Sequence, residues 1–238
     1  MWSRLQGKSL AVKPVDYVFG TTDAFVSISS CNYYLAFLEM AHFPGFGLKL
    51  SRISVKTFQQ AQTEGAMFTM GRLESLEQDG NGFSGTDVNG IRYSAPCAIV
   101  ASGRVPRRLP VTHSEMKGVN FCSVCDGPLF RGENATLAVV GSDNAAAQHA
   151  LTLDEETISV DGVFLTIGWS PNTAMIKPFV ETIDGGYLKT DGKLMTSIPG
   201  MFAAGYVRDT DLYQVLTGCT DGARCALYAS EFIKRSLP

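Results

Sequence analysis

"ATLAVVGSDNAAAQHAL", residues 135–151, joins two different hydrophobic patterns in one short stretch. Its first half is an apolar run that ends at a glycine, which is typical of a buried strand. The polar residues after the glycine indicate a tight turn, and the remainder of the stretch predicts a helix. A strand that passes directly into a helix is the repeating unit of parallel sheets. This stretch therefore predicts an α/β fold.

The rest of the chain extends the same alternation. Strands are predicted at 15–20, 33–39, 97–103, 158–168 and 200–205, and helices after residue 20, at 51–64 and at 221–236. The last helix is expected to pack through Ala223, Ala226, Leu227 and Phe232. The turn signals "DGNG" (79–82) and "NG" (89–90) predict hairpins within 67–100. The whole pattern predicts an α/β protein with a largely parallel sheet.

The composition excludes several classes of protein. A chain of 238 residues is long enough for one large domain or two small ones. Its net charge of −3 gives no basis for expecting nucleic acid as a partner. No apolar run approaches the roughly 20 residues that span a bilayer as a helix. Six cysteines are too few and too scattered for a disulfide-rich secreted scaffold, so a reducing compartment is expected, either the cytoplasm or an organelle interior.

The stretch "FCSVCDGPLF" (121–130) places Cys122 and Cys125 three positions apart. A structural zinc site would need a second pair of ligands, and the remaining cysteines and histidines lack the spacing for it. Two unrelated core cysteines are the other alternative. A Cys-x-x-Cys pair in an α/β chain instead favours a redox dithiol, because the short loop lets a disulfide close. Asp126 adds an acid that can move the proton of each exchange step.

A series of motifs runs through the chain in a fixed order. They are "FPGF", "AIVASG", "CSVCDG", "RGENATLAVVG", "VDGVFLTIGWSPNT", "GGYLKTDGKLMTSIPGMFAAGYVRD" and "QVLTGCTDGARCA". Together they cover roughly residues 43–238, and their number and order make them specific. In this order they resemble the low-molecular-weight thioredoxin reductases.

The resemblance implies two domains. A Rossmann-like FAD-type domain would comprise residues 1–112 and 164–238, and a shortened second nucleotide-binding domain at 113–163 would carry the dithiol. Such enzymes pass electrons from NADPH through FAD to a disulfide substrate. By the same resemblance, Cys125 would face the flavin and Cys122 would attack the disulfide of the partner. Asp126 would serve as the acid.

The resemblance also implies a set of residues along the FAD. They are Gly20, Glu39, Ala101, Gly103, Gly205, Gln214, Asp221, Gly222 and Ala223. Glu39 follows Gly20 at about the 20-residue spacing of a ribose-binding acid. The last three would form the start of a helix whose dipole lies near the flavin ring.

The first dinucleotide motif departs from the family pattern. The turn that reads G-x-G-x-x-G in the family reads "GTTDAF" (20–25) here, so only Gly20 is retained. Glycines let the backbone approach a pyrophosphate, and Asp23 places a negative charge where the phosphate would lie. The family's C-terminal Gly-Asp pair reads Gly205-Tyr206. FAD binding is therefore expected to be weak or absent.

The second dinucleotide motif departs further. In "GSDNAA" (141–146), Asp143 replaces a glycine and would repel a pyrophosphate. Only residues 142–160 lie between Gly141 and Asp161, whereas one βαβ unit takes about 30 residues. The basic cluster that would read the 2′-phosphate of NADPH does not occur there. Direct use of NADPH is therefore not expected.

Three functions are compatible with these features. The first is a flavin disulfide reductase supplied by a protein electron donor. The second is a degenerate family member with a structural or regulatory role, as a homodimer or within a larger complex. The third is a flavin-free dithiol protein that exchanges disulfides with a thioredoxin-like or other disulfide protein. Dithiol–disulfide exchange at Cys122 and Cys125 is the preferred interpretation, and the non-catalytic subunit is its alternative.

Overall fold

The structure is a computed structural model of the 238-residue chain. It describes residues 17–20, 25–29, 59, 61–63, 66–70, 72–80, 82–108, 118–121, 127–130, 134–141 and 159–236. The strand predicted at 33–39 and the helix predicted after residue 141 lie outside these residues. Of the helix predicted at 51–64, the described residues 59 and 61–63 are helical.

The main sheet has the strand order β13-β7-β2-β1-β3. Its strands are β1 (Tyr17–Gly20), β2 (Phe25–Ser29), β3 (Met67–Met70), β7 (Cys97–Val100) and β13 (Met201–Ala203). β1 pairs parallel to β3, and β7 pairs parallel to β13. Strand β2 runs antiparallel to both of its neighbours, β1 and β7. The strands predicted at 15–20, 97–103 and 200–205 are thus confirmed.

Strand β2 corrects one prediction, because a helix was expected after residue 20. The described segment "FVSIS" alternates apolar and polar residues with the two-residue period of a strand. It pairs with β1 in a register that opposes Gly20 to Phe25. β1 and β2 are therefore antiparallel neighbours, and residues 25–29 form a strand where a helix was expected.

A second sheet is antiparallel and forms the region predicted to contain hairpins. It consists of β4 (Leu73–Asp79), β5 (Gly82–Asp87) and β6 (Arg92–Ala95) in sequential order. Gly80 and Gly90, in the two connecting turns, have φ of 57° and 79°. These left-handed values favour glycine, which explains why the two glycine-containing turn signals predicted the hairpins correctly.

The core lies on both faces of the parallel pair β7–β13. Alternate residues of each strand enter different clusters. One cluster joins Ala98 and Met201 to the antiparallel sheet, and the other joins Ile99 and Phe202 to helix α4 (Val215–Ser236). Burial on both faces requires apolar residues at every position, so these strands read as continuous apolar runs.

Helix α4 begins six residues before the predicted start at residue 221. Its buried face contains Asp221, Cys225, Ala229 and Ile233, four positions apart. Only part of the predicted face is confirmed: Phe232 packs against this core cluster, but Leu227 is 47% exposed and Ala223 is exposed. Cys225 donates a thiol hydrogen bond to Ala203 O at 3.4 Å, so small side chains bring this helix close to β13. The prediction missed the small and polar members of the buried face, Asp221, Cys225 and Ala229.

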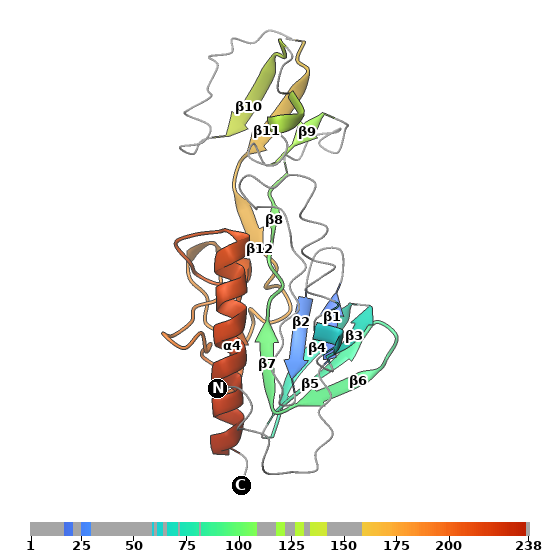
Figure 1. The fold of residues 1–238 in the computed structure, drawn as a ribbon, viewed down its shortest axis with the longest axis vertical. Coiled ribbons are helices and arrows are strands. Elements are labelled where there is room, and N and C mark those ends of the chain that lie inside the picture. The colour runs from blue at the N-terminus through green and yellow to red at the C-terminus, as the bar shows by residue number, and fades with distance from the viewer. Residues whose placement is uncertain are drawn as a thin grey trace.

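A small parallel sheet stands apart from the main sheet and α4 (Figure 1). Its strands, in the order β10-β11-β9, are β9 (Val119–Asn120), β10 (Leu137–Gly141) and β11 (Gly162–Thr166). A two-stranded ribbon, β8 (Arg104–Pro106) against β12 (Trp169–Pro171), connects it to the rest of the molecule. The predicted α/β class, with a Rossmann-like domain and a shortened second one, is confirmed. The exact domain limits remain a prediction.

Three short 3-10 helices complete the described part: η2 (Gly127–Phe130), η3 (Asp184–Gly186) and η4 (Gly205–Val207). Phe130 of η2 packs edge-on against Phe164 of β11, with 6.0 Å between ring centroids. This contact fixes η2 against the small sheet. None of the helices described is both long and apolar enough to cross a membrane.

Asp87 ends β5 with a buried carboxylate. Its Oδ1 accepts hydrogen bonds from the backbone N–H groups of Asn89 and Ile91, both at 2.9 Å. Its Oδ2 accepts from the Tyr93 hydroxyl at 3.2 Å. Burial by itself would raise the pKa of Asp87, but these hydrogen bonds, led by the one from Ile91, leave it below the ordinary value of 3.8.

We expect Asp87→Ala to lower the urea midpoint of unfolding at neutral pH, because three donors lose their acceptor. The folded-state pKa is lowered, so this stabilisation is present above pH 3.8 and is lost as the pH falls through the folded value. The difference in urea midpoint between wild type and Asp87→Ala should therefore become smaller at acidic pH. Asp211→Ala, at an exposed position, is the control and should shift the midpoint little. A gap that is constant with pH would contradict the prediction.

Candidate functional site

The candidate site lies at the carboxyl ends of β7 and β13. The two strands are parallel, and the N–H of Ala204 donates to Val100 O at 2.9 Å just where they end. The loops 101–103 and 204–205 therefore leave the sheet side by side. In open α/β sheets, ligands bind outside the carboxyl ends of the strands. The structure thus brings together three of the predicted FAD-contacting residues, Ala101, Gly103 and Gly205.

The loop 101–103 is tied to Asn172, which follows β12. Ser102 Oγ donates to Asn172 O at 2.7 Å, and Asn172 Nδ2 donates to Ser102 O at 2.8 Å. The backbone N–H of Asn172 donates to Gly103 O at 2.9 Å. These three bonds join the main sheet to the connecting ribbon. Sequence reasoning did not single out Asn172, although it lies within the motif "VDGVFLTIGWSPNT".

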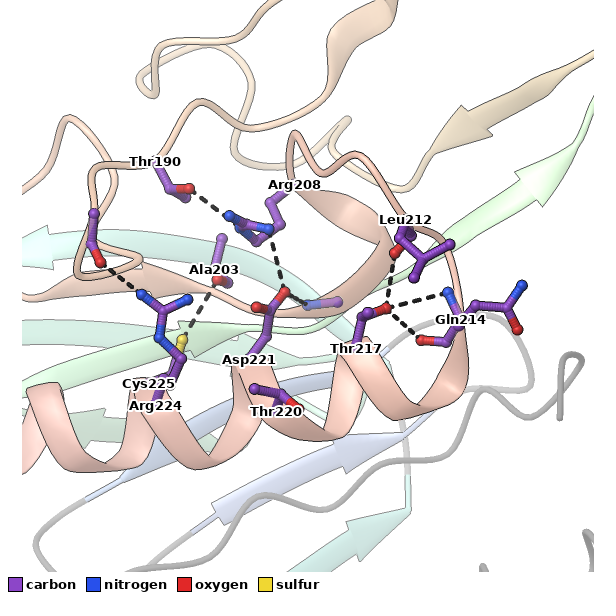
Figure 2. A network of polar contacts seen from close by, with 12 residues as sticks. Thr190, Ala203, Arg208, Leu212, Gln214, Thr217, Thr220, Asp221, Arg224 and Cys225 are labelled. Carbon is purple, nitrogen blue, oxygen red and sulfur yellow. Dashed lines mark hydrogen bonds and ion pairs between the residues drawn. The ribbon is translucent and has the colours of Figure 1, made fainter.

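Asp221 of α4 holds the loop 204–205 (Figure 2). Its Oδ2 accepts the backbone N–H of Gly205 at 3.1 Å and Arg208 Nη1 at 3.3 Å. Arg208 Nε in turn donates to Thr190 Oγ1 at 3.2 Å. The side chains of Arg208 and Asp221 are only 15% and 10% exposed. The Asp221 carboxylate therefore binds groups of the protein itself.

The start of α4 supplies the helix dipole at this edge. The N–H of Gly218 donates to Gln214 O at 3.1 Å, the first bond of the helix. The Thr217 hydroxyl accepts the N–H of Gln214 at 3.2 Å, which caps this end (Figure 2). The prediction that residues 221–223 form the helix start is therefore wrong. Asp221 and Gly222 are buried in the second turn, and Ala223 is exposed.

A stack of aromatic side chains around Arg104 adjoins these loops. The Arg104 guanidinium carbon lies 3.7 Å from the ring centroid of Tyr213, 4.8 Å from that of Trp169 and 5.3 Å from that of Tyr206. Arg104 Nη1 also donates to the Tyr187 hydroxyl at 3.4 Å. We refer to these five residues as the Arg104 stack. Sequence reasoning singled out only Tyr206 among them.

The phenol of Tyr213 is at the centre of this stack. Burial raises the pKa of Tyr213 to about 12; Tyr187 adds to the rise and the Arg104 cation opposes it. Tyr213 therefore stays protonated at neutral pH, and its neutral ring faces the cation. Tyr187 and Tyr206 pack against the same ring, with centroid distances of 5.7 and 5.6 Å.

FAD is the cofactor that the resemblance implies at this edge, and the described residues do not fit it well. The Gly205 N–H is engaged by Asp221, and the ring of Tyr206 lies within the Arg104 stack. Gly20 pairs with Phe25 and Met70, and the next described residues, 25–29, form a strand and not a helix whose N-terminus would bind phosphate. Glu39 lies outside the described residues. FAD contact by the predicted residues stays a prediction.

The predicted dithiol, Cys122 and Cys125, lies outside the described residues, as does Asp126. The segments on either side are described: β9 ends at Asn120, and η2 begins at Gly127. The dithiol segment therefore follows the carboxyl end of a strand in a parallel sheet, where ligands bind in such folds. The roles of these three residues stay predictions.

The described cysteines differ from one another. Cys97 and Cys225 are buried, as expected for structural thiols. Burial and the nearby Asp221 carboxylate raise the pKa of the Cys225 thiol. Cys219 is exposed on α4, although partial desolvation still raises its pKa. In the part of the chain that the structure describes, no group of three His, Cys, Asp or Glu side chains is placed to hold a metal ion.

Comparisons with known proteins relate this geometry to a family. Residues 142–222 match the family model for pyridine nucleotide-disulphide oxidoreductases. The thioredoxin reductase of Listeria monocytogenes is 26% identical, with 82% of this chain and 81% of that protein covered. A 34.2 kDa protein of the rubredoxin operon of Clostridium pasteurianum is also 26% identical. That match covers 60% of this chain and 66% of the other protein, which is just under two thirds of its length.

The fold has counterparts among solved structures. The thioredoxin reductase of Streptococcus pyogenes superposes with a TM-score of 0.66 at 23% identity, and the match covers 84% of this chain and 86% of that one. An identity this low establishes the fold alone. Together with the family match and the curated relatives, it confirms what the ordered motifs predicted. The chain is therefore similar to thioredoxin reductases in sequence and in fold, and part of it matches the pyridine nucleotide-disulphide oxidoreductase family.

Proposed function

We propose that this protein is a dithiol–disulfide oxidoreductase that acts through Cys122 and Cys125 and does not use NADPH directly. The observation that supports this most is the intact Cys-x-x-Cys-Asp sequence, which follows β9 closely in the chain. The described cysteines are poor alternatives, because Cys97 and Cys225 are buried and Cys219 stands alone.

The proposed reaction is a two-step exchange with a disulfide protein, thioredoxin-like or other. The Cys122 thiolate attacks one sulfur of the partner's disulfide and forms a mixed disulfide, and the other partner sulfur leaves as a thiolate. The Cys125 thiolate then attacks the Cys122 sulfur, which closes the intramolecular disulfide and releases the second partner thiol. Asp126 accepts and returns the proton. The partner gains two electrons, which this dithiol loses.

Return to the reduced state requires an electron donor, which we propose to be a reduced protein. Asp143 and the short connection between β10 and β11 argue against NADPH. A reducing compartment, the cytoplasm or an organelle interior, would keep such a dithiol in use.

The alternative is a thioredoxin-reductase-like subunit with a structural or regulatory role, as a homodimer or in a larger complex. The Arg104 stack favours it, because the side chains at the predicted flavin edge contact one another. The buried Arg208–Asp221 pair favours it as well, since Asp221 is engaged within the protein. Thiol chemistry separates this alternative from the proposed function.

We expect mild oxidant to close a Cys122–Cys125 disulfide that dithiothreitol reopens, with Cys122 the more accessible thiol before oxidation. Thiol labelling read by mass spectrometry provides the test. Cys97 and Cys225 serve as slow buried references. Cys219 is an exposed reference whose raised pKa lowers its thiolate fraction at neutral pH.

The Cys122→Ser and Cys125→Ser variants should each lose exchange with bis(2-hydroxyethyl) disulfide, and Cys219→Ser should retain it. In Cys125→Ser the mixed disulfide should accumulate, because the resolving thiol is absent. If Cys122 labels no faster than Cys97 and neither cysteine forms a disulfide, the non-catalytic alternative replaces the proposed function.

We expect no oxidation of NADPH above a protein-free blank, with or without a disulfide substrate. The reason is that Asp143 repels the pyrophosphate and the sheet connection is too short for a full nucleotide domain. The measurement is the absorbance of reduced nicotinamide over time, with dithiothreitol as the positive control for exchange by the same preparation. Steady NADPH consumption that depends on Cys122 would contradict this expectation.

A further inference from the structure

The guanidinium of Arg104 occupies a place shaped for a planar group. It lies 3.7 Å from the ring centroid of Tyr213, which is direct stacking contact, and 4.8 Å from that of Trp169. The ring of Tyr206 stands nearly perpendicular to that of Tyr213, at 85°. A planar cation among aromatic rings is a favourable arrangement for arginine in particular.

The members of the Arg104 stack adjoin the residues that were predicted to contact flavin. Arg104 directly follows Gly103, and Tyr206 directly follows Gly205. Tyr213 directly precedes Gln214 at the start of α4. Three segments expected to line a flavin thus meet through the side chains of their neighbouring residues. Figure 1 shows β8, which carries Arg104, and β12, which carries Trp169, leaving the main sheet beside the first turns of α4.

We propose that Arg104 is a built-in occupant of the flavin position, and that its planar cation makes the stacking contacts on Tyr213 that an isoalloxazine ring would otherwise make. A flavin cannot stack on that face of Tyr213 unless Arg104 leaves. Departure of Arg104 would break its contacts with Trp169, Tyr206 and Tyr187 together. This inference deepens the proposed function: the dithiol exchange would proceed without flavin in this chain.

A second feature of the edge agrees with this. The Gly205 N–H, just after the carboxyl end of β13, donates to Asp221 Oδ2 at 3.1 Å. Arg208 compensates the Asp221 charge through an ion pair with the same oxygen, at 3.3 Å. The Asp221 carboxylate thus accepts the backbone N–H of Gly205, and the Arg104 guanidinium lies over the ring of Tyr213. Both kinds of contact that a flavin nucleotide requires are made within the protein.

Lumiflavin tests the proposal, because it is the isoalloxazine ring without phosphates and so does not depend on the turn at 20–25. Its fluorescence is quenched when it stacks on tyrosine or tryptophan. We expect no binding to the wild type and at least tenfold tighter binding to Arg104→Ala. Arg107→Ala is the matched control: Arg107 adjoins the same ribbon and contacts Ser170, not the rings, so this variant should behave as wild type.

Trp169 fluorescence provides a second measurement. Trp2 is the only other tryptophan, so a Trp2→Phe background isolates the indole of the stack. Lumiflavin should quench it in Arg104→Ala but not in the unsubstituted background. Arg104→Gln is used in parallel in case the alanine variant does not fold. The glutamine side chain is shorter than arginine and should likewise vacate the space between the rings. Circular dichroism confirms that the variants are folded.

Each outcome decides the proposal. Wild type that retains FAD through purification, or binds lumiflavin as tightly as Arg104→Ala, overturns it. Folded Arg104 variants that bind lumiflavin no better than Arg107→Ala overturn it as well. Exchange with bis(2-hydroxyethyl) disulfide is measured on the same wild-type preparation. If the wild type shows no exchange, the proposed function is refuted. Either of the contrary flavin-binding results would refute only the role of Arg104.

Discussion

Burial of the parallel pair β7–β13 on both faces is the constraint on which the rest of the structure depends. Two strands buried in this way need a layer on each side, and the antiparallel sheet and helix α4 supply those layers. Each fully buried side chain, such as Phe202 or Met201, contributes about 1.5–3 kcal/mol relative to exposure. The carboxyl ends of β7 and β13 therefore lie between the antiparallel sheet and α4. The position of the candidate site follows from this packing.

The Arg208–Asp221 pair fixes the same edge by polar contacts. Removing one partner of a buried ion pair typically costs about 3–5 kcal/mol, because the remaining charge stays buried. Here Asp221 also accepts the Gly205 N–H, and Arg208 also donates to Thr190. The pair therefore holds η4, the segment near Thr190 and the second turn of α4 in one arrangement. Its value lies in fixing three segments more than in its net contribution to stability.

The sequence predicted those elements whose local pattern and tertiary setting agree. Strand β7 reads as an apolar run because it is buried on both faces, and the hairpin turns contain the glycines that their backbone requires. Strand β2 was missed because the alternation of strands and helices suggested a helix after residue 20, although "VSIS" alternates as a strand does. The true start of α4 was missed because its first turns contain Thr217, Gly218 and Cys219, which are weak helix formers.

The backbone of the candidate site was easier to predict than its side chains. Glycines and small residues in the loops 101–103 and 204–205 indicated where β7 and β13 end. The Arg104 stack joins residues that are far apart in the chain, from Arg104 to Tyr213, and no spacing rule connects them. One usable signal was present: Arg104, Tyr206 and Tyr213 each adjoin a residue predicted to contact FAD. Bulky or charged residues at such positions indicate that the edge is filled from within.

The backbone landmarks of a cofactor edge and its ligand contacts thus depend on different physical requirements. Strands β7 and β13 and the buried face of α4 are needed to pack the core, whether or not a cofactor binds. The side chains that face the edge carry no such requirement, so they can form a stack of their own without loss of fold. Dithiol exchange needs a thiolate, a second thiol and a proton acceptor, all within 122–126. A protein with this fold can therefore replace the cofactor contacts at the main edge with contacts of its own and still keep its core.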